Sequence, residues 1–185
     1  MSESEKHSMA HWLGVVGFVG LFAMVLSFGR LMTAQSTRSA GSDNRFAADA
    51  AAGGLAEVKL GELAQEKASD PAVRAFGRRM AEDHTKAGDQ LKQVARTQNI
   101  ALPVALNSTD QARYDQLSKL SGPEFDHAYM QMMVKDHEKD VAEFQKEASS
   151  GKNPPFKHFA AQILPTLEDH LREARDVAAN RKASR

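Results

Sequence analysis

Four segments of this chain repeat apolar residues at steps of three and four, and this periodicity restricts the chain to an all-α fold. Each repeat continues for about 25 residues, enough for a helix about 37 Å long. Four amphipathic helices must cover one another's apolar faces, so the pattern predicts a bundle. The faces, with one polar exception in each, consist of Phe46, Ala50, Gly53, Glu57, Leu60 and Ala64; of Val73, Phe76, Met80, His84, Ala87, Leu91 and Val94; of Met130, Met133, His137, Val141 and Phe144; and of Phe156, Phe159, Ile163, Leu167, His170, Ala174 and Val177.

Capping residues and prolines mark the ends of these helices. The links between the first and second helices and between the third and fourth are short, so each pair is expected to be antiparallel. We therefore predict that residues 45–180 form an up-down antiparallel four-helix bundle, with a short helix over about residues 110–120 in the longer central link. The expected starts are Ser42 or Asp43, then Asp70-Pro71, the capping-box sequence Ser121-Gly122-Pro123-Glu124, and Asn153-Pro154.

An uncharged apolar run, WLGVVGFVGLFAMVLSF, occupies residues 12–28 ahead of the bundle. It is apolar on every face, which is unlike the helix of a soluble domain. We predict that residues 1–34 are a membrane anchor, crossing the bilayer with residues 9–32, or a cleaved signal segment. Residues 35–44 are small and polar, as in a linker.

The charges on either side of the apolar run leave the location of the bundle open. Lys6 precedes the run, whereas Arg30, Arg38 and Arg45 follow it. By the positive-inside rule this distribution would hold the bundle in the cytoplasm. An export signal would place the bundle outside instead, so the side of the membrane stays undecided.

Overall composition excludes several classes of function. Lys and Arg number 24, as do Asp and Glu, and a net charge of zero argues against a nucleic-acid partner. The chain has no cysteine, which excludes disulfides, thiolate catalysis and cysteine-ligated metals. We find no phosphate-binding loop, nucleophile elbow or Ser-His-Asp arrangement, so we assign no catalytic residue and expect a protein that is not an enzyme.

One strongly polar residue interrupts each apolar face: Glu57, His84, His137 and His170. Each lies near the middle of its own helix, and the midpoints of antiparallel helices share one level. The four side chains should therefore meet within about one helical turn, ~5 Å, of one another. Three imidazoles and a carboxylate can complete a tetrahedral set around zinc, copper or iron, so the sequence predicts a site for one transition-metal ion.

Each of the three histidines directly follows an aspartate: Asp83, Asp136 and Asp169. Adjacent residues lie about 100° apart around a helix, so each aspartate points toward a neighbouring helix. There it could accept the remaining ring N–H of that helix's histidine, as carboxylates behind metal ligands do. The alternative is a hydrogen-bonded polar layer that fixes the register of the bundle and binds nothing.

An ordered series of residues resembles the bacterial domain-of-unknown-function family 4142. The resemblance covers about residues 46–178 and implies a ferritin-like four-helix fold. It also implies a bacterial protein, usually exported to the periplasm or outer envelope, with an expected metal-binding role and no assigned reaction. Together with the N-terminal apolar run, it predicts a protein anchored in the inner membrane or exported to the periplasm. The series comprises Phe46, Gly54, Glu57-Val58, Leu60-Gly61-Glu62-Leu63-Ala64, Phe76, Met80, Asp83-His84, Leu102-Pro103, Phe125-Asp126, Tyr129, Met133-Val134, Asp136-His137, Leu164-Pro165 and His170-Leu171.

The sequence departs from the di-iron pattern of ferritins, which needs two Glu-x-x-His pairs. Three residues before the histidines stand Ala81, Val134 and Leu167, so a single ion fits better than a di-iron centre. The leading hypothesis is a metal-binding bundle for sensing, storage or buffering. A structural or interaction module is the rival hypothesis, and a metal-dependent oxidoreductase is the third.

Glycines in the first helix should weaken it, since glycine is a poor helix former. Gly53, Gly54 and Gly61 are expected to offset this cost by allowing a neighbouring helix to pack closely.

Overall fold

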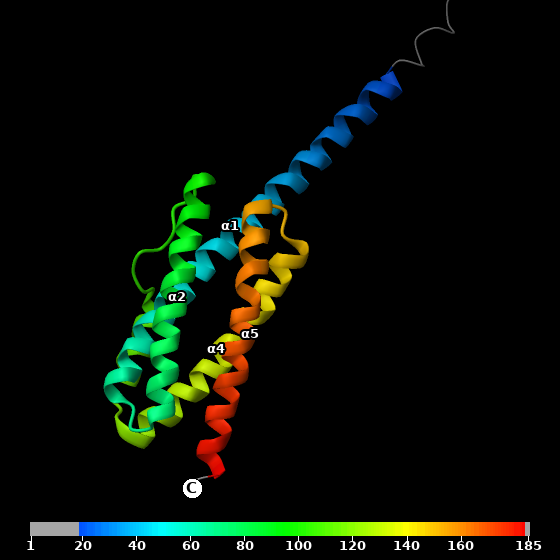
Figure 1. The fold of residues 1–185 in the computed structure, drawn as a ribbon. Coiled ribbons are helices and arrows are strands. Elements are labelled where there is room, and N and C mark those ends of the chain that lie inside the picture. Colours follow the sequence, from blue (N-terminus) through cyan, green and yellow to red (C-terminus); the bar gives the residue numbers. More distant parts are fainter. Residues whose placement is uncertain (1–18, 184–185) are drawn as a thin grey trace, which may run out of the picture. The chain divides into compact units, whose positions relative to one another are not determined.

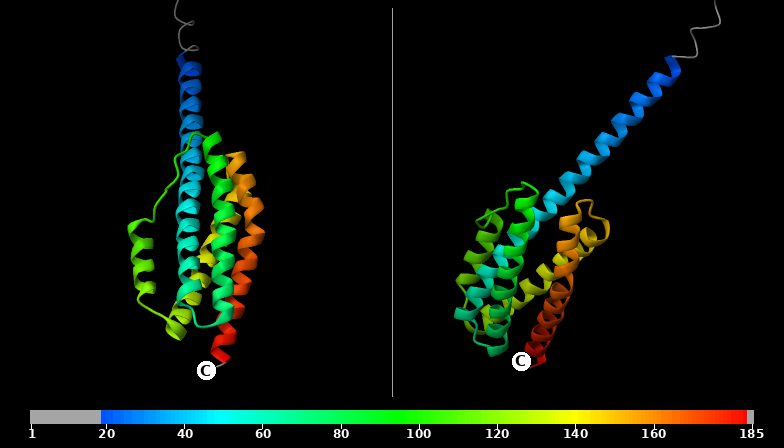
Figure 2. Two further views of the ribbon diagram at one scale, coloured as in Figure 1. Left: turned by 60° about the vertical axis from the view of Figure 1, so that its left-hand side comes forward. Right: turned by 45° about the horizontal axis from the view of Figure 1, so that its top comes forward.

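The computed structural model describes the backbone of residues 19–183 and the side chains of residues 41–180. Five helices and no strand occur in this part of the chain (Figures 1 and 2). The chain divides into two units, Met1–Ser39 and Ala40–Arg185, and the bundle belongs to the second. The helices are α1 (Val19–Lys67), α2 (Pro71–Thr97), α3 (Ser108–Ser118), α4 (Gly122–Ser150) and α5 (Pro154–Ala183).

Helix α1 begins earlier than the sequence suggested. It continues without a break through residues 35–44, so the predicted linker is helical and no cap forms at Ser42 or Asp43. The buried carboxylate of Asp43 instead accepts hydrogen bonds from the backbone N–H groups of Lys152, at 2.9 Å, and Asn153, at 2.5 Å. These donors lie in the turn between α4 and α5, so Asp43 joins α1 to that turn.

The predicted membrane segment is described only in part. Residues 1–18, which hold the first part of the apolar run, lie outside the described residues. Within residues 19–183, no helix is both long enough and apolar enough to span a bilayer.

The starts of α2 and α5 are as predicted. Asp70 caps α2 by accepting a 2.8 Å hydrogen bond from the backbone N–H of Ala72. Asn153 accepts a longer, 3.4 Å hydrogen bond from the N–H of Phe156 at the start of α5. The predicted capping box of α4 is wrong, because the side chain of Ser121 makes no capping hydrogen bond. Gly122 directly after it has a left-handed backbone, with φ +61°, which turns the chain into the helix.

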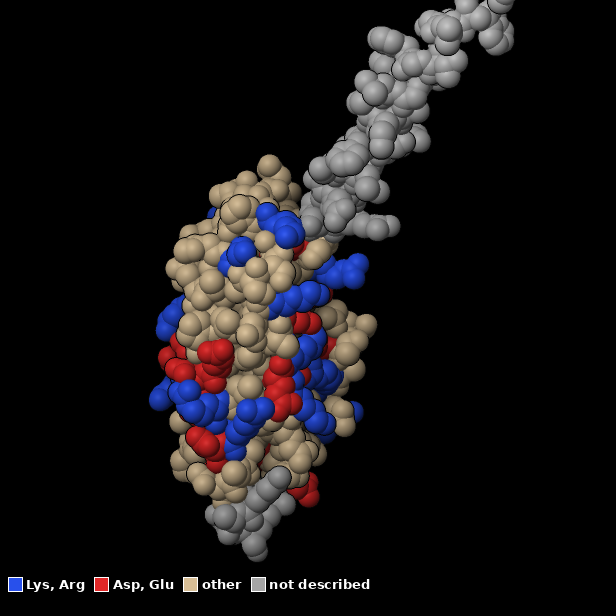
Figure 3. Space-filling model, turned by 90° about the vertical axis from the view of Figure 1, so that its right-hand side faces the viewer, with Lys and Arg blue, Asp and Glu red and all other residues tan. Residues whose placement is uncertain are grey.

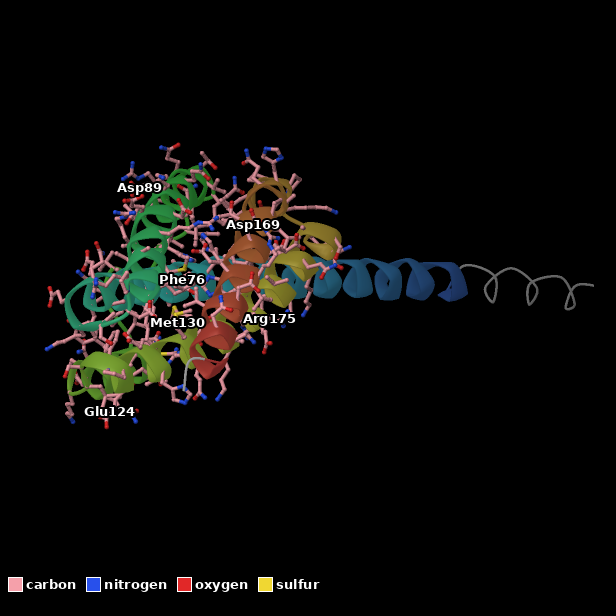
Figure 4. All side chains as sticks on the ribbon, turned by 60° about the horizontal axis from the view of Figure 1, so that its bottom comes forward. Phe76, Asp89, Glu124, Met130, Asp169 and Arg175 are labelled. Carbon is pink, nitrogen blue, oxygen red and sulfur yellow. The ribbon has the colours of Figure 1, made fainter. Side chains whose placement is uncertain are left out.

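Two hydrophobic clusters fill the bundle on either side of the polar residues. We call them the packed half and the open half. In Figure 4, Phe76 and Met130 of the packed half point into the interior, whereas Asp89, Glu124 and Arg175 point outward. The packed half consists of Leu60, Leu63, Ala64, Ala68, Val73, Phe76, Met80, Leu117, Phe125, Tyr129, Met130, Met133 and Ala174. The open half consists of Phe46, Ala47, Leu91, Phe144, Phe156, Phe159, Ala160 and Leu167.

In the packed half, glycines bring α1 and α2 into backbone contact. A Cβ added to Gly61 would overlap the carbonyl oxygen of Gly77, and one added to Gly77 would lie 2.6 Å from Cβ of Ala64. The close packing predicted at Gly61 is therefore confirmed. The same prediction is wrong for Gly53, where an added Cβ would meet nothing within 4 Å.

The surface agrees with the balanced composition. On the face shown in Figure 3, the coloured Lys and Arg side chains are interspersed with Asp and Glu. A stripe of one sign, of the kind that binds nucleic acid, does not occur on that face.

Candidate metal centre

The four predicted polar residues lie together in the bundle interior. Their exposed fractions are 3% for Glu57, 7% for His84, 0% for His137 and 1% for His170. The centroids of the three imidazole rings lie 5.3 to 5.6 Å apart. The four residues belong to α1, α2, α4 and α5, respectively. Their side chains meet because each occupies a mid-helix position on the apolar face of its helix.

Two of the imidazoles are held by carboxylates from other helices. Nδ1 of His84 lies 3.0 Å from Oε2 of Glu57, and Nε2 of His170 lies 3.1 Å from Oδ2 of Asp83. Such contacts fix the orientation of an imidazole ring and determine which nitrogen carries the proton.

A backbone carbonyl holds the third ring. Nδ1 of His137 lies 3.0 Å from the carbonyl oxygen of Met133, one turn earlier in α4. The same nitrogen lies 3.4 Å from Oε1 of Glu57. Each histidine therefore has one ring nitrogen directed at an oxygen atom, and its other nitrogen is left for a different partner.

Those other nitrogens face one another. Nε2 of His137 lies 3.4 Å from Nδ1 of His170. Nε2 of His84 is buried and has no hydrogen-bond partner. The three histidines each offer one ligand atom, and these atoms lie within 4.8 Å of one another, which is close enough to share one ion.

The carboxylate of Glu57 contacts the ring nitrogens of His84 and His137 but does not belong to this group of possible ligands. Among the described residues, the group of side chains able to share an ion comprises the three histidines and not Glu57. Its Oε2 is engaged with His84 instead. Three of the four predicted ligands thus form a group that could hold an ion, and the fourth, Glu57, contacts two of them.

The electrostatics of the cluster keep Glu57 ionised. Burial alone would raise the pKa of Glu57, but the charges of His84 and His137 lower it to about 2. Burial also acts to lower the pKa of His84, yet Glu57 raises it above its ordinary value. Glu57 thus favours the protonated form of His84, and His84 favours the ionised form of Glu57.

The other two imidazoles favour the neutral form, which metal ligands require. Burial, followed by the charge of His84, lowers the pKa of His170 to about 4. Burial likewise lowers the pKa of His137. At neutral pH both rings therefore have a lone pair available.

Only one of the three aspartates takes the predicted place behind a histidine. Asp83 does so, whereas Asp136 pairs with Arg113 of α3. Asp169 lies half-exposed on α5 and pairs with Arg172, one turn away, at 2.7 Å. Helix geometry predicted that each aspartate points toward a neighbouring helix. It did not predict that Arg113 of α3 would lie beside Asp136.

The sequence analysis missed a fourth aspartate near the cluster. Asp140 follows His137 by one turn of α4, and that spacing could have revealed it. Burial and the charge of Glu57 raise the pKa of Asp140 well above its ordinary value. No hydrogen bond or ion pair involves its carboxyl group within the described part of the chain.

Asp140, Glu57 and His84 also line a pocket of about 460 Å³ in the open half. The pocket lies between α1, α2, α4 and α5, and the residues after α2 form part of its rim. Most of its wall is apolar, with contributions from Leu91, Phe144, Phe159, Ile163 and Leu167.

Comparison with known proteins agrees with this architecture. The sequence model of the family described as "Domain of unknown function (DUF4142)" matches residues 29–177. The chain belongs to the DUF4142 family. No curated protein sequence matches this DUF4142 chain significantly.

Solved structures of another family, DUF305, share the fold of the DUF4142 chain. A DUF305 fragment from Deinococcus radiodurans is 16% identical, with a TM-score of 0.65 over 75% of this chain and 96% of its own. A candidate secreted DUF305 protein from Streptomyces coelicolor is 17% identical, with a TM-score of 0.65 over 76% of this chain and 92% of its own. These likenesses establish a helical-bundle fold.

Proposed function

We propose that this DUF4142 protein binds one transition-metal ion, zinc, copper or iron, through the imidazoles of His84, His137 and His170. The observation that carries the proposal is the buried Nε2 of His84, which has no hydrogen-bond partner among the described side chains and backbone. Buried polar atoms are nearly always paired, so one that faces two other imidazoles suits a bound ion. A single layer of inward-facing groups also fits an up-down, ferritin-like arrangement of the four long helices.

Three features support a metal site over chance proximity. Glu57, Asp83 and the carbonyl of Met133 each hold one imidazole by its other nitrogen. This is the usual arrangement behind metal-bound histidines, where an oxygen acceptor orients the ring. Three imidazoles leave a fourth position for water or a small ligand around a tetrahedral ion. The bundle's own contribution is to hold these rings fixed in its interior.

A purely structural layer is the second candidate. The ion pair between Glu57 and His84, with a 3.0 Å separation, supports it, because a buried pair of this kind can fix the register of helices. The two candidates differ in what they require of His137. A metal site needs its ring, whereas in a structural layer a Leu of similar volume could replace it at little cost to stability.

The test is metal binding by the full chain without a histidine tag. After treatment with a chelator, the protein is titrated with zinc and with copper, and the variants His84→Ala and His137→Ala are compared with it. The exposed His158→Ala variant is the matched control. We expect one ion per chain in the parent and the control, and at least a 100-fold weaker affinity in the two core variants.

Thermal melts give an independent readout. Zinc should raise the melting temperature of the parent, since an ion that binds only the folded state stabilises it. The rise should vanish in His137→Leu, even if that variant is itself as stable as the parent. If zinc raised the melting temperatures of the parent and of His137→Leu equally, the metal site would be rejected in favour of the structural layer.

We further propose that the protein is exported or anchored at the bacterial envelope. Support comes from the uncharged run at residues 12–28 and from the DUF305 neighbour described as a candidate secreted protein. Protease treatment of intact and of permeabilised cells tests this: digestion of the bundle only after the cytoplasmic membrane is opened would contradict export.

A further inference from the structure

Glycines are among the residues that line the pocket in the open half. Gly88 follows His84 by one turn of α2 and precedes the buried Leu91, so it lies on the buried face of that helix. A Cβ added to Gly88 would meet nothing within 4 Å, and the same holds for Gly53 on α1. Both residues line the pocket. Larger side chains at these two positions would occupy part of the pocket, whose volume is about 460 Å³.

The carboxyl groups of Glu57 and Asp140 belong to residues that line this space. Among the described residues, Oε1 of Glu57 makes no hydrogen bond, although Glu57 is only 3% exposed and Nδ1 of His137 lies 3.4 Å away. Asp140, also in the pocket wall, has no hydrogen-bond partner among the described residues. Lys92, which pairs with Asp89, and Arg96 also line the pocket, but among the described residues no ion pair joins either side chain to Asp140.

From this arrangement we infer that the pocket binds a small apolar molecule that carries a protonated amine. The apolar body would contact the wall formed by Leu91, Phe144 and Phe159, and the amine would donate hydrogen bonds to Asp140 and to Oε1 of Glu57. A volume of this size, mostly apolar with a few converging polar groups, is typical of a small-molecule site. A protonated amine would also give Asp140 a charge-assisted hydrogen bond, which is stronger than one from a neutral donor.

This binding does not depend on the proposed metal. Oε1 of Glu57 and Asp140 are not among the atoms assigned to the ion, so the experiment uses chelator-treated protein. Failure of amine binding would leave the metal proposal standing, and failure of metal binding would leave this one.

Fluorescence titration of the full chain with 1-naphthylmethylamine tests the inference. Two probes with the same ring control for the head group: 1-naphthylmethanol, which is neutral, and 1-naphthylacetate, which is an anion. We expect the amine to bind with a dissociation constant below about 1 mM, at least tenfold more tightly than the alcohol and more tightly still than the acetate.

Three variants locate the site. Gly88→Leu should fill the pocket and weaken amine binding at least tenfold, and a Leu in place of a helical Gly should not impair folding where open space surrounds it. Gly41→Leu is the matched control, because Gly41 also lies in a helix with nothing within 4 Å of an added Cβ, but outside the pocket. It should bind like the parent. Asp140→Asn should weaken the amine about tenfold and leave the alcohol unchanged.

Several results would overturn the inference. These are the lack of amine binding to the parent, equal binding of acetate and amine, and undiminished binding by a folded Gly88→Leu variant. Circular dichroism establishes that each variant is folded. If Gly88→Leu does not fold, Asp140→Asn still decides: unchanged discrimination between amine and alcohol would reject the role of the carboxyl group.

Discussion

At Gly61 and Gly77, α1 and α2 touch through their backbones, whereas at Gly53 and Gly88 the same helices leave a space. The residue type is the same in both places, and the Glu57–His84 pair separates them. The difference shows that glycine in a bundle helix has two uses. It removes a side chain so that backbones can meet, or it removes one so that volume remains.

The largest expected effect is at the backbone contact. Gly61→Leu should destabilise the folded chain by about 3 kcal/mol or more, because the new side chain would overlap Gly77 and backbone atoms cannot move aside cheaply. Urea denaturation measures the change. Gly53→Leu is the comparison, and a loss as large as that of Gly61→Leu would show that no space exists at Gly53.

Two leucines with equal exposure compare the halves directly. Leu60 in the packed half and Leu91 beside the pocket are each 2% exposed. Leu60→Ala should lower the free energy of unfolding by about 3–4 kcal/mol, and Leu91→Ala by about 2 kcal/mol, since Leu91 already borders empty space and loses fewer contacts. Equal losses in thermal or urea unfolding would mean that the two halves are packed alike.

The open half also contains a poorly solvated acid. Glu147 is 5% exposed, and burial together with the charge of Asp43 raises its pKa from 4.5 to about 6. The folded state then binds this proton more tightly than the unfolded state, so stability should fall as pH rises from about 4.5 to about 6. Glu147→Gln should remove that slope and stabilise the chain by about 1 kcal/mol at pH 7.

Unfolding curves recorded from pH 4 to pH 8 measure the effect of Glu147. The exposed Glu66→Gln is the control and should keep the slope. Persistence of the slope in Glu147→Gln would assign it to another group.

The smallest expected effect is that of adding one methyl group to a helical glycine, either in open space or at a backbone contact. Gly88→Ala should stabilise the chain by about 0.5–1 kcal/mol, because Ala is the better helix former and its Cβ enters open space. Gly77→Ala should destabilise it, since its Cβ would lie 2.6 Å from that of Ala64. Thermal melts of the pair would contradict the comparison if both changes had the same sign.

Periodicity was sufficient to predict the helices and the layer. The apolar repeat located α2, α4 and α5, and the mid-helix positions of His84, His137 and His170 explain why their rings meet. Both results depend only on spacing along single helices.

Features that depend on the separation of helices could not be predicted in this way. Gly53 and Gly61 look alike in sequence, and only the crossing of α1 with α2 decides which one is close-packed. Asp136 forms an ion pair with Arg113 of α3. The periodicity of the long helices does not predict where α3 lies, so this partner could not be foreseen. The role of Glu57 as a partner of His84 likewise depends on atomic distances within the layer.

X-ray absorption at the zinc edge of the zinc-loaded full chain tests the central claim most directly, because it counts imidazole ligands. The account predicts three histidine nitrogens at about 2.0–2.1 Å and one further ligand such as water, with a histidine signal that falls in His170→Ala and is retained in His158→Ala. A spectrum with fewer than three imidazoles, or one that His170→Ala leaves unchanged, would contradict it.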